Sequence, residues 1–167
     1  ILPRTDHEGE RKQILVVEDN DDIRTYIKES LEAHFDVWEA ANGKEGLRMA
    51  QEKDLALIIS DIAMPEMDGL EFCTHIKSDI QTSHIPVILL TARTSLIYKI
   101  DGFEKGADDY VTKPFNMQLL KTRIDNLIQS RQRLREVFKQ GYELTPSNLT
   151  VASLDEEFLQ KVLQLIE

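Results

Sequence analysis

The feature that most constrains this chain is a regular alternation of short apolar runs with segments of helical spacing. The runs that predict strands cover 13–17, 35–39, 55–60, 85–90 and 108–111, and the segments that predict helices cover 20–34, 42–52, 69–77, 96–104 and 116–140. Strands that alternate with helices indicate a parallel sheet covered on both faces. Four runs are almost continuously hydrophobic, as doubly buried strands are. The second run alternates polar and apolar residues, which predicts a strand at the sheet edge.

Polar residues that could take part in catalysis or ligand binding lie where the predicted strands end. Glu18 and Asp19 follow the first strand, and Asp61 follows the third. Thr91 ends the fourth strand, and Lys113 follows the fifth. The binding crevice of an open α/β sheet lies at the carboxyl ends of its strands, where the strand order reverses. Only the edge strand contributes no such residue, which fits the order 2-1-3-4-5 of the flavodoxin-like template.

This set of residues suits phosphoryl transfer onto a carboxylate. Three carboxylates in one crevice repel one another, and a hard cation such as Mg²⁺ removes that repulsion because it prefers oxygen ligands. A carboxylate can attack phosphorus to give an aspartyl phosphate, and the transfer depends mainly on positioning and charge neutralisation. Mg²⁺, the Lys113 ammonium and the Thr91 hydroxyl together meet that need. Each residue alone is common in turns and loops, so the prediction rests on their conjunction at four strand ends.

The motifs around these residues resemble the receiver domain of two-component response regulators. The resemblance covers about residues 12–130, and its motifs are Ile14–Asn20, Asp61–Gly69, Leu90–Arg93 and Gly106–Phe115. It implies that Asp61 accepts a phosphoryl group from a histidine of a partner kinase, and that Lys113 pairs with that group. It also implies a cis peptide bond between Lys113 and Pro114, of the X-Pro type in which a cis form is accessible.

The resemblance further implies a metal site and a switch. The implied Mg²⁺ ligands are the carboxylates of Asp19 and Asp61 and the backbone carbonyl of Ala63, with Glu18 acting through water. Thr91 and Tyr110 match the switch pair of the family, in which the hydroxyl moves toward the phosphoryl group and the ring turns inward. The alternative for Tyr110 is a half-buried strand aromatic with a hydrated hydroxyl. Arg93 flanks the site, where we expect it to shield the acyl phosphate from water.

A charged set on the predicted output face resembles residues that pair across a two-fold dimer in one transcription-factor subfamily. The set consists of Lys99, Glu104, Asp108, Asp109 and Arg123. The face is built from the fourth helix, the fifth strand and the fifth helix. The match is partial because Leu119 stands where a carboxylate is expected. A homodimer promoted by phosphorylation is therefore implied, with ordinary scattered surface charge as the alternative.

The two ends of the chain differ in pattern from the predicted receiver domain at 13–130. Residues 1–12 are polar and aperiodic and indicate a linker or tail. Residues 131–167 extend the last helix and contain Leu144–Asn148 and a capping box at Ser153–Glu156. This connector resembles the segment before a helix-turn-helix module of the arabinose-regulator type, as in hybrid histidine kinases that carry a receiver. The alternative is a receiver with a dimerising helical extension.

Composition narrows the partners and the compartment. The formal net charge of -10 argues against nonspecific binding of nucleic acid or of anionic membranes by this segment, so DNA contact would need the further C-terminal module. The single cysteine, Cys73, excludes an internal disulfide and suits the cytoplasm. No apolar stretch approaches the roughly 18 residues that span a bilayer. We expect a cytoplasmic segment, or the cytoplasmic part of a membrane-anchored sensor.

Rival functions fit the sequence less well. A phosphatase of the haloacid-dehalogenase type needs a second acid two residues after its nucleophile, where this chain has Ala63. A nucleotide-binding domain would show a glycine-rich phosphate motif after the first strand, and none is present. An inert pseudo-receiver that serves only in dimerisation remains the main alternative. We therefore predict a signalling switch that assists its own phosphorylation and dephosphorylation, rather than a free-standing enzyme.

Overall fold

The structure, a computed structural model, describes residues 11–92, 106–143, 161–162 and 164–165. The chain divides into two compact units, residues 1–124 and 125–167. The predicted helix at 96–104, the connector at 144–148 and the capping box at 153–156 lie outside the described residues. The predicted division at residues 130 and 131 stays a prediction.

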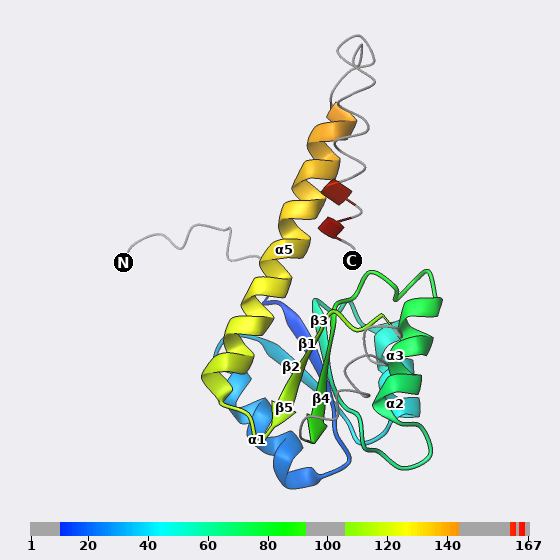
Figure 1. The fold of residues 1–167 in the computed structure, drawn as a ribbon, viewed down its shortest axis with the longest axis vertical. Coiled ribbons are helices and arrows are strands. Elements are labelled where there is room, and N and C mark those ends of the chain that lie inside the picture. Colours follow the sequence, from blue (N-terminus) through cyan, green and yellow to red (C-terminus); the bar gives the residue numbers. More distant parts are fainter. Residues whose placement is uncertain (1–10, 93–105, 144–160, 163, 166–167) are drawn as a thin grey trace. The chain divides into compact units, whose positions relative to one another are not determined.

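A single five-stranded parallel sheet forms the centre of the first unit (Figure 1). Its strands are β1 (Gln13–Val17), β2 (Asp36–Ala40), β3 (Leu57–Asp61), β4 (Val87–Ala92) and β5 (Asp109–Lys113). The order β2-β1-β3-β4-β5 confirms the predicted flavodoxin-like arrangement, with β2 at an edge.

Four strands, β2 to β5, end one or two residues later than the runs that predicted them. The ladder between β3 and β4 still pairs Asp61 with Leu90, and the ladder between β4 and β5 pairs Ala92 with Lys113. Backbone pairing therefore continues past the last hydrophobic side chain. As a result Asp61 and Lys113 are the last residues of their strands, and Thr91 is the penultimate residue of β4.

Side-chain caps start three of the four described helices. The helices are α1 (Asp21–Leu31), α2 (Gly43–Glu52), α3 (Gly69–Ser78) and α5 (Met117–Glu143). Asn20, Asn42 and Asp68 each accept a hydrogen bond from the amide three residues later, which satisfies an orphan donor of the first turn. The prediction extended the first helix to residue 34. It ends at Leu31 because the amides of two following residues both turn back to the Leu31 carbonyl.

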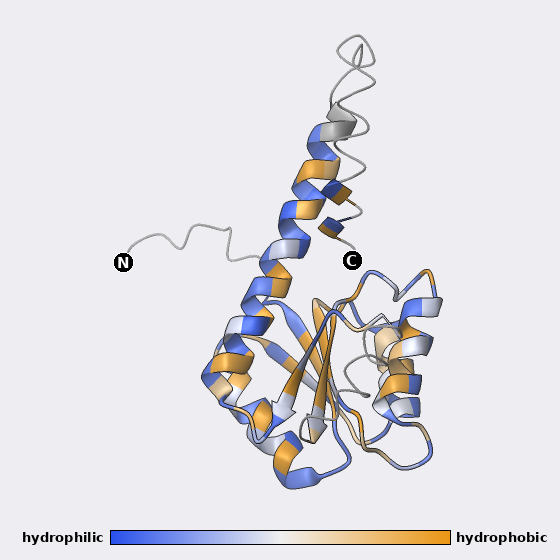
Figure 2. Ribbon diagram, in the orientation of Figure 1, coloured by the Kyte–Doolittle hydropathy of each residue, from blue (hydrophilic) through white to orange (hydrophobic). Residues whose placement is uncertain are grey.

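The sheet is buried on both faces because successive side chains of each strand point to opposite sides. Leu15 and Val17 belong to a core cluster with Cys73 and Phe72 of α3. Ile14 and Val16, which are also fully buried, point to the other face, where α1 and the first turns of α5 lie (Figure 1). Figure 2 shows hydrophobic residues gathered along the strands, whereas the helices alternate hydrophobic and hydrophilic bands.

Cys73, the single cysteine of the chain, has a packing role on α3. Its side chain is buried in the core cluster, and it forms no disulfide.

In the second unit, α5 continues to Glu143 and Val162 is buried. Among the described residues, no helix combines the length and apolar character needed to cross a membrane.

Candidate functional site

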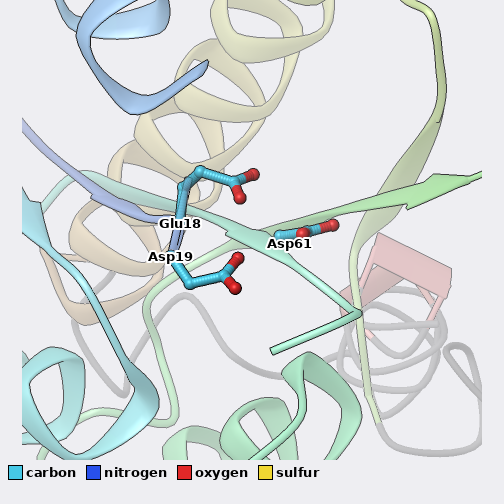
Figure 3. A group of neighbouring side chains, drawn as sticks. All are labelled: Glu18, Asp19 and Asp61. Carbon is cyan, nitrogen blue, oxygen red and sulfur yellow. The ribbon is translucent and has the colours of Figure 1, made fainter. Parts of the chain in front are cut away.

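Three carboxylates meet at the carboxyl edge of the sheet. Strands β1 and β3 are neighbours in parallel register, with Val17 opposite Ser60, so the residues at their ends come together. One carboxylate oxygen from each of Glu18, Asp19 and Asp61 lies within 4.8 Å of the others. Figure 3 shows these side chains at the ends of the two strands. Glu18 and Asp61 are only 1% and 5% exposed, whereas Asp19 is open to solvent.

Lys113 joins this group from the end of β5. Its Nζ lies 3.0 Å from Asp61 Oδ1 and 3.1 Å from Glu18 Oε2. The side chain spans the width of β4, which lies between β3 and β5. The Lys113–Pro114 peptide bond is cis, as the resemblance implied. Four of the predicted site residues, the three acids and this lysine, are thus brought together.

The site has more acidic groups than basic ones, and the pKa values of Glu18 and Lys113 are both shifted. Burial raises the pKa of Glu18 to about 7, with the nearby Asp61 adding to the effect against opposing contributions from the Asn20 amide and Lys113. Burial by itself would lower the pKa of Lys113, but hydrogen bonding and attraction to Asp61, followed by Glu18, outweigh it and raise that pKa. One ammonium therefore faces three carboxyl groups.

The donor set fits a hard divalent cation. All three side chains offer carboxylate oxygens, the ligand type that Mg²⁺ prefers, and Asp19 keeps the group open to water and to a phosphoryl ligand. Their surplus negative charge is what a dication would offset. Soft or nitrogen ligands are absent from this cluster.

The turn after β1 holds the first two acids through its backbone. The Glu18 amide donates to the Ala40 carbonyl of β2 at 3.0 Å, and the Glu18 carbonyl accepts from Arg24 Nη1 at 2.7 Å. The Asn20 amide donates to Glu18 Oε1 at 3.1 Å. Sequence analysis assigned no role to Arg24. Its only local signal is its place one turn into α1, from where a long side chain can reach back to the strand end.

A glycine allows the loop after β3 to fold tightly against the strand end. A Cβ atom at Gly69 would lie 2.1 Å from the Asp61 carbonyl oxygen, so only glycine fits there. The Gly69 amide donates to the Ile62 carbonyl at 2.8 Å. Glu66 in the same loop has a φ of 68°, a left-handed conformation that is uncommon for a residue with a side chain. Ala63, the predicted carbonyl ligand, is exposed in this loop two residues after Asp61, and its role as a ligand stays a prediction.

The predicted switch residues lie on neighbouring strands. Thr91 is 3% exposed near the end of β4, in register with Thr112 of β5. Tyr110 is half-buried and packs against the core cluster, in register with Leu89. A paired movement of the two side chains stays a prediction.

The predicted dimer set is only partly within the described residues. Arg123 donates to Asp109 through two hydrogen bonds of 2.8 and 3.1 Å. Asp108 binds Lys77 Nζ at 2.8 Å and accepts from the Val87 amide at the same distance. Both aspartates thus have partners in their own chain, and their role in a dimer stays a prediction. Lys99, Glu104 and the flanking Arg93 lie outside the described residues.

Comparison with known proteins identifies the family. Residues 14–125 match the family model of the response regulator receiver domain. The chain belongs to this family. It is 48% identical over 160 residues to histidine kinase P4 of Formosa agariphila, covering 96% of this chain and 12% of that protein. It is 40% identical over 121 residues to the transcriptional regulatory protein SrrA of Staphylococcus aureus, covering 72% of this chain and 49% of that protein.

The receiver fold is also recognised in solved structures. The Vibrio cholerae chemotaxis protein CheY4 aligns with a TM-score of 0.68 and 34% identity, covering 71% of this chain and 99% of that chain. The chain thus spans 12% of the length of the kinase relative and about half of the length of the regulator relative. Receiver domains are signalling switches rather than metabolic enzymes, in agreement with the prediction from sequence.

Proposed function

We propose that this receiver domain accepts a phosphoryl group on Asp61 from a histidine of a kinase. The observation that supports this most directly is the setting of Asp61, which ends β3 with 5% exposure and has Lys113 Nζ 3.0 Å from its Oδ1. In the reaction a carboxylate oxygen of Asp61 forms a bond to phosphorus. The bond from phosphorus to the histidine nitrogen breaks, and its electron pair stays on the imidazole.

The side chains around Asp61 would manage the charge of that transfer. The Lys113 ammonium already contacts the acceptor carboxylate and would pair with a phosphoryl oxygen, while the Thr91 hydroxyl would donate to another. Asp19, Asp61 and the Ala63 carbonyl would hold Mg²⁺, with Glu18 acting through water, and the bound cation supplies positive charge opposite the phosphoryl oxygens. Thr91 and Tyr110 would then relay the change to the surface.

The names of two relatives support a longer hybrid protein that combines a histidine kinase, this receiver and a DNA-binding module. The similarity to a protein named histidine kinase extends over 160 residues and therefore beyond the 14–125 match to the receiver family. A second relative is named a transcriptional regulatory protein. On this basis we propose a kinase, in the same polypeptide or a separate one, and DNA, through a further module, as partners. The proposed homodimer would use the face of the fourth helix, β5 and α5. Cys73, which forms no disulfide, is consistent with a proposed cytoplasmic location.

Mass spectrometry after incubation with Mg²⁺ and acetyl phosphate tests the proposal. We expect one added phosphoryl group on the native protein, labile to base, and none on Asp61→Asn. Asp68→Asn is the matched control, because Asp68 lies in the same loop, is exposed and caps α3 through an oxygen that asparagine retains. An adduct that persists in Asp61→Asn would refute the assignment. No adduct on native protein, with acetyl phosphate or with a phosphorylated kinase, would favour the pseudo-receiver alternative.

A further inference from the structure

Arg24 is a largely buried cation beside the acidic site that the phosphoryl transfer does not use. Its side chain is 15% exposed and reaches three separate elements. Nη1 donates to the Glu18 carbonyl at the end of β1 at 2.7 Å, and Nη2 binds Asp21 Oδ1 at the start of α1 at 2.5 Å. Nε lies 3.6 Å from Glu39 Oε1 on β2. The planar fork of an arginine suits such a set of partners, which a lysine cannot reproduce.

The contact with Glu18 fixes the backbone that carries Asp19. The carbonyl of Glu18 and the amide of Asp19 belong to one planar peptide unit, so a bond that holds the carbonyl also orients the Asp19 Cα. The Asp19 side chain is exposed and, within the described residues, makes no hydrogen bond or ion pair. Its direction toward Glu18 and Asp61 therefore depends on the turn, and the bond from Arg24 is the side-chain contact that holds the Glu18 carbonyl of that turn.

The positive charge of Arg24 is paired with acids outside the candidate cation site. Asp21 and Glu39, neither of which belongs to the three clustered acids, both lie within ion-pair distance of its guanidinium. We propose that Arg24 is a positioning residue for cation binding, which clamps the Glu18 carbonyl and so holds Asp19 in place before the cation arrives. This inference rests on the proposed function, because it takes the three acids as the cation site. Residues that orient metal ligands typically change metal affinity by about 10- to 100-fold when they are removed.

Electrostatic repulsion and ligand positioning predict opposite changes in cation affinity when Arg24 is removed. A positive charge near the site repels a dication, so removing the charge alone would tighten cation binding. Removing the clamp frees the turn, so Asp19 has to be ordered again when the cation binds, and affinity falls. The direction of the change therefore distinguishes the two roles without any measurement of phosphorylation.

Titration of the full chain with Mn²⁺, followed by the electron paramagnetic resonance signal of free Mn²⁺, tests this proposal. We expect Arg24→Gln to weaken Mn²⁺ binding about tenfold or more. Arg24→Lys should weaken it by a smaller factor, because an ammonium can still donate one hydrogen bond toward the Glu18 carbonyl but lacks the planar fork. Arg48→Gln is the matched control: it removes the same charge from an exposed pair with Glu52 on α2 and should leave affinity within about twofold. Circular dichroism during urea unfolding confirms that each variant is folded.

A double-mutant cycle shows whether Arg24 acts through Asp19. In an Asp19→Asn background, Arg24→Gln should have little further effect on Mn²⁺ affinity, whereas a general loosening of the fold would add its full effect. Unchanged or tighter Mn²⁺ binding by Arg24→Gln alone would overturn the inference and leave the proposed function intact. If the native protein failed to bind Mn²⁺, the metal site of the proposed function would fail, and the inference with it.

Discussion

Two half-buried lysines, one where the strands of the sheet begin and one where they end, have different charged neighbours. At the edge where β4 and β5 begin, Lys77 Nζ lies 2.8 Å from Asp108 Oδ2. At the edge where the strands end, Lys113 lies between Asp61 and Glu18. The side chains of the two lysines are exposed to a similar extent, 17% and 20%. The two sites therefore differ in the balance of charge and in the burial of their acids, since Glu18 is 1% exposed and Asp108 is 14% exposed.

The Lys77 site is balanced and saturated with hydrogen bonds. Lys77 also donates to the Ile85 carbonyl at 2.8 Å, and Asp108 also accepts from the Val87 amide at 2.8 Å. One cation and one anion thus join α3 to the starts of β4 and β5. The Lys113 site has one cation for three carboxyl groups and holds Glu18 at a pKa of about 7. The first site completes the fold, and the second leaves charge for a ligand to neutralise.

The largest expected effect comes from breaking the balanced site. Asp108→Ala should lower the free energy of unfolding by about 3 kcal/mol, because it strands the Lys77 charge and an amide donor in a poorly hydrated place. Urea unfolding at fixed ionic strength measures the loss. Asp109→Ala is the matched control: its partner Arg123 is 46% exposed, so that loss should be about 1 kcal/mol or less. Equal losses at both positions would contradict the view of the Lys77 pair as a distinct structural contact.

The reactivity of the Cys73 thiol measures how often the core beside the Lys77 site opens. Burial raises its pKa from 9.0 to about 11, and the charges of Lys77 and Asp108 make smaller, opposing contributions. Because the thiolate is the reactive form, this shift alone should slow reaction with a disulfide reagent by about 100-fold at about pH 8. We expect slow labelling of native protein, fast labelling in urea, and faster labelling in Asp108→Ala, whose fold opens more often. Rapid labelling of native protein would show that this core is not closed.

The sequence was sufficient to predict the convergence of the site because the topology does most of the positioning. Alternating strands and helices predict parallel strands, and parallel strands bring Glu18, Asp61 and Lys113 to one edge whatever the details of the loops. Strand ends were less predictable, since hydrogen-bonded pairing runs past the last apolar residue at Asp61 and Lys113. A hydrophobic pattern records which side chains are buried, and it does not record where backbone pairing stops.

Contacts of long side chains with distant partners could not be predicted from local patterns. Arg24 reaches a backbone carbonyl six residues before it, and Lys77 pairs with Asp108 across 31 residues of sequence. Resemblance grouped Asp108 with Asp109 on one face. In the structure the first, in the bend before β5, binds Lys77 of α3, and the second, at the start of β5, binds Arg123 of α5. Such partners depend on the packed arrangement of elements.

The smallest predicted effect tests the imbalance at the Lys113 site directly. With divalent cations removed, Glu18→Gln should be more stable than the native protein by about 2 kcal/mol at about pH 8, because glutamine keeps an acceptor for Lys113 without a buried charge. The folded pKa of Glu18, about 7, lies above its ordinary 4.5, so the folded state binds this proton more tightly. The native protein should therefore lose stability relative to the variant as the pH rises from about 4.5 to 7, and the gap should stay constant above that range.

Urea unfolding in a chelator across this pH range measures the gap, and added Mg²⁺ should narrow it by stabilising the native protein. Glu52→Gln on α2 is the control, because its exposed pair with Arg48 should contribute little at any pH. If Glu18→Gln were instead less stable than the native protein at about pH 8 without cations, Glu18 would contribute to stability through Lys113 as Asp108 does through Lys77. The two sites would then be alike, and the surplus of negative charge could no longer be taken as the sign of a cation site.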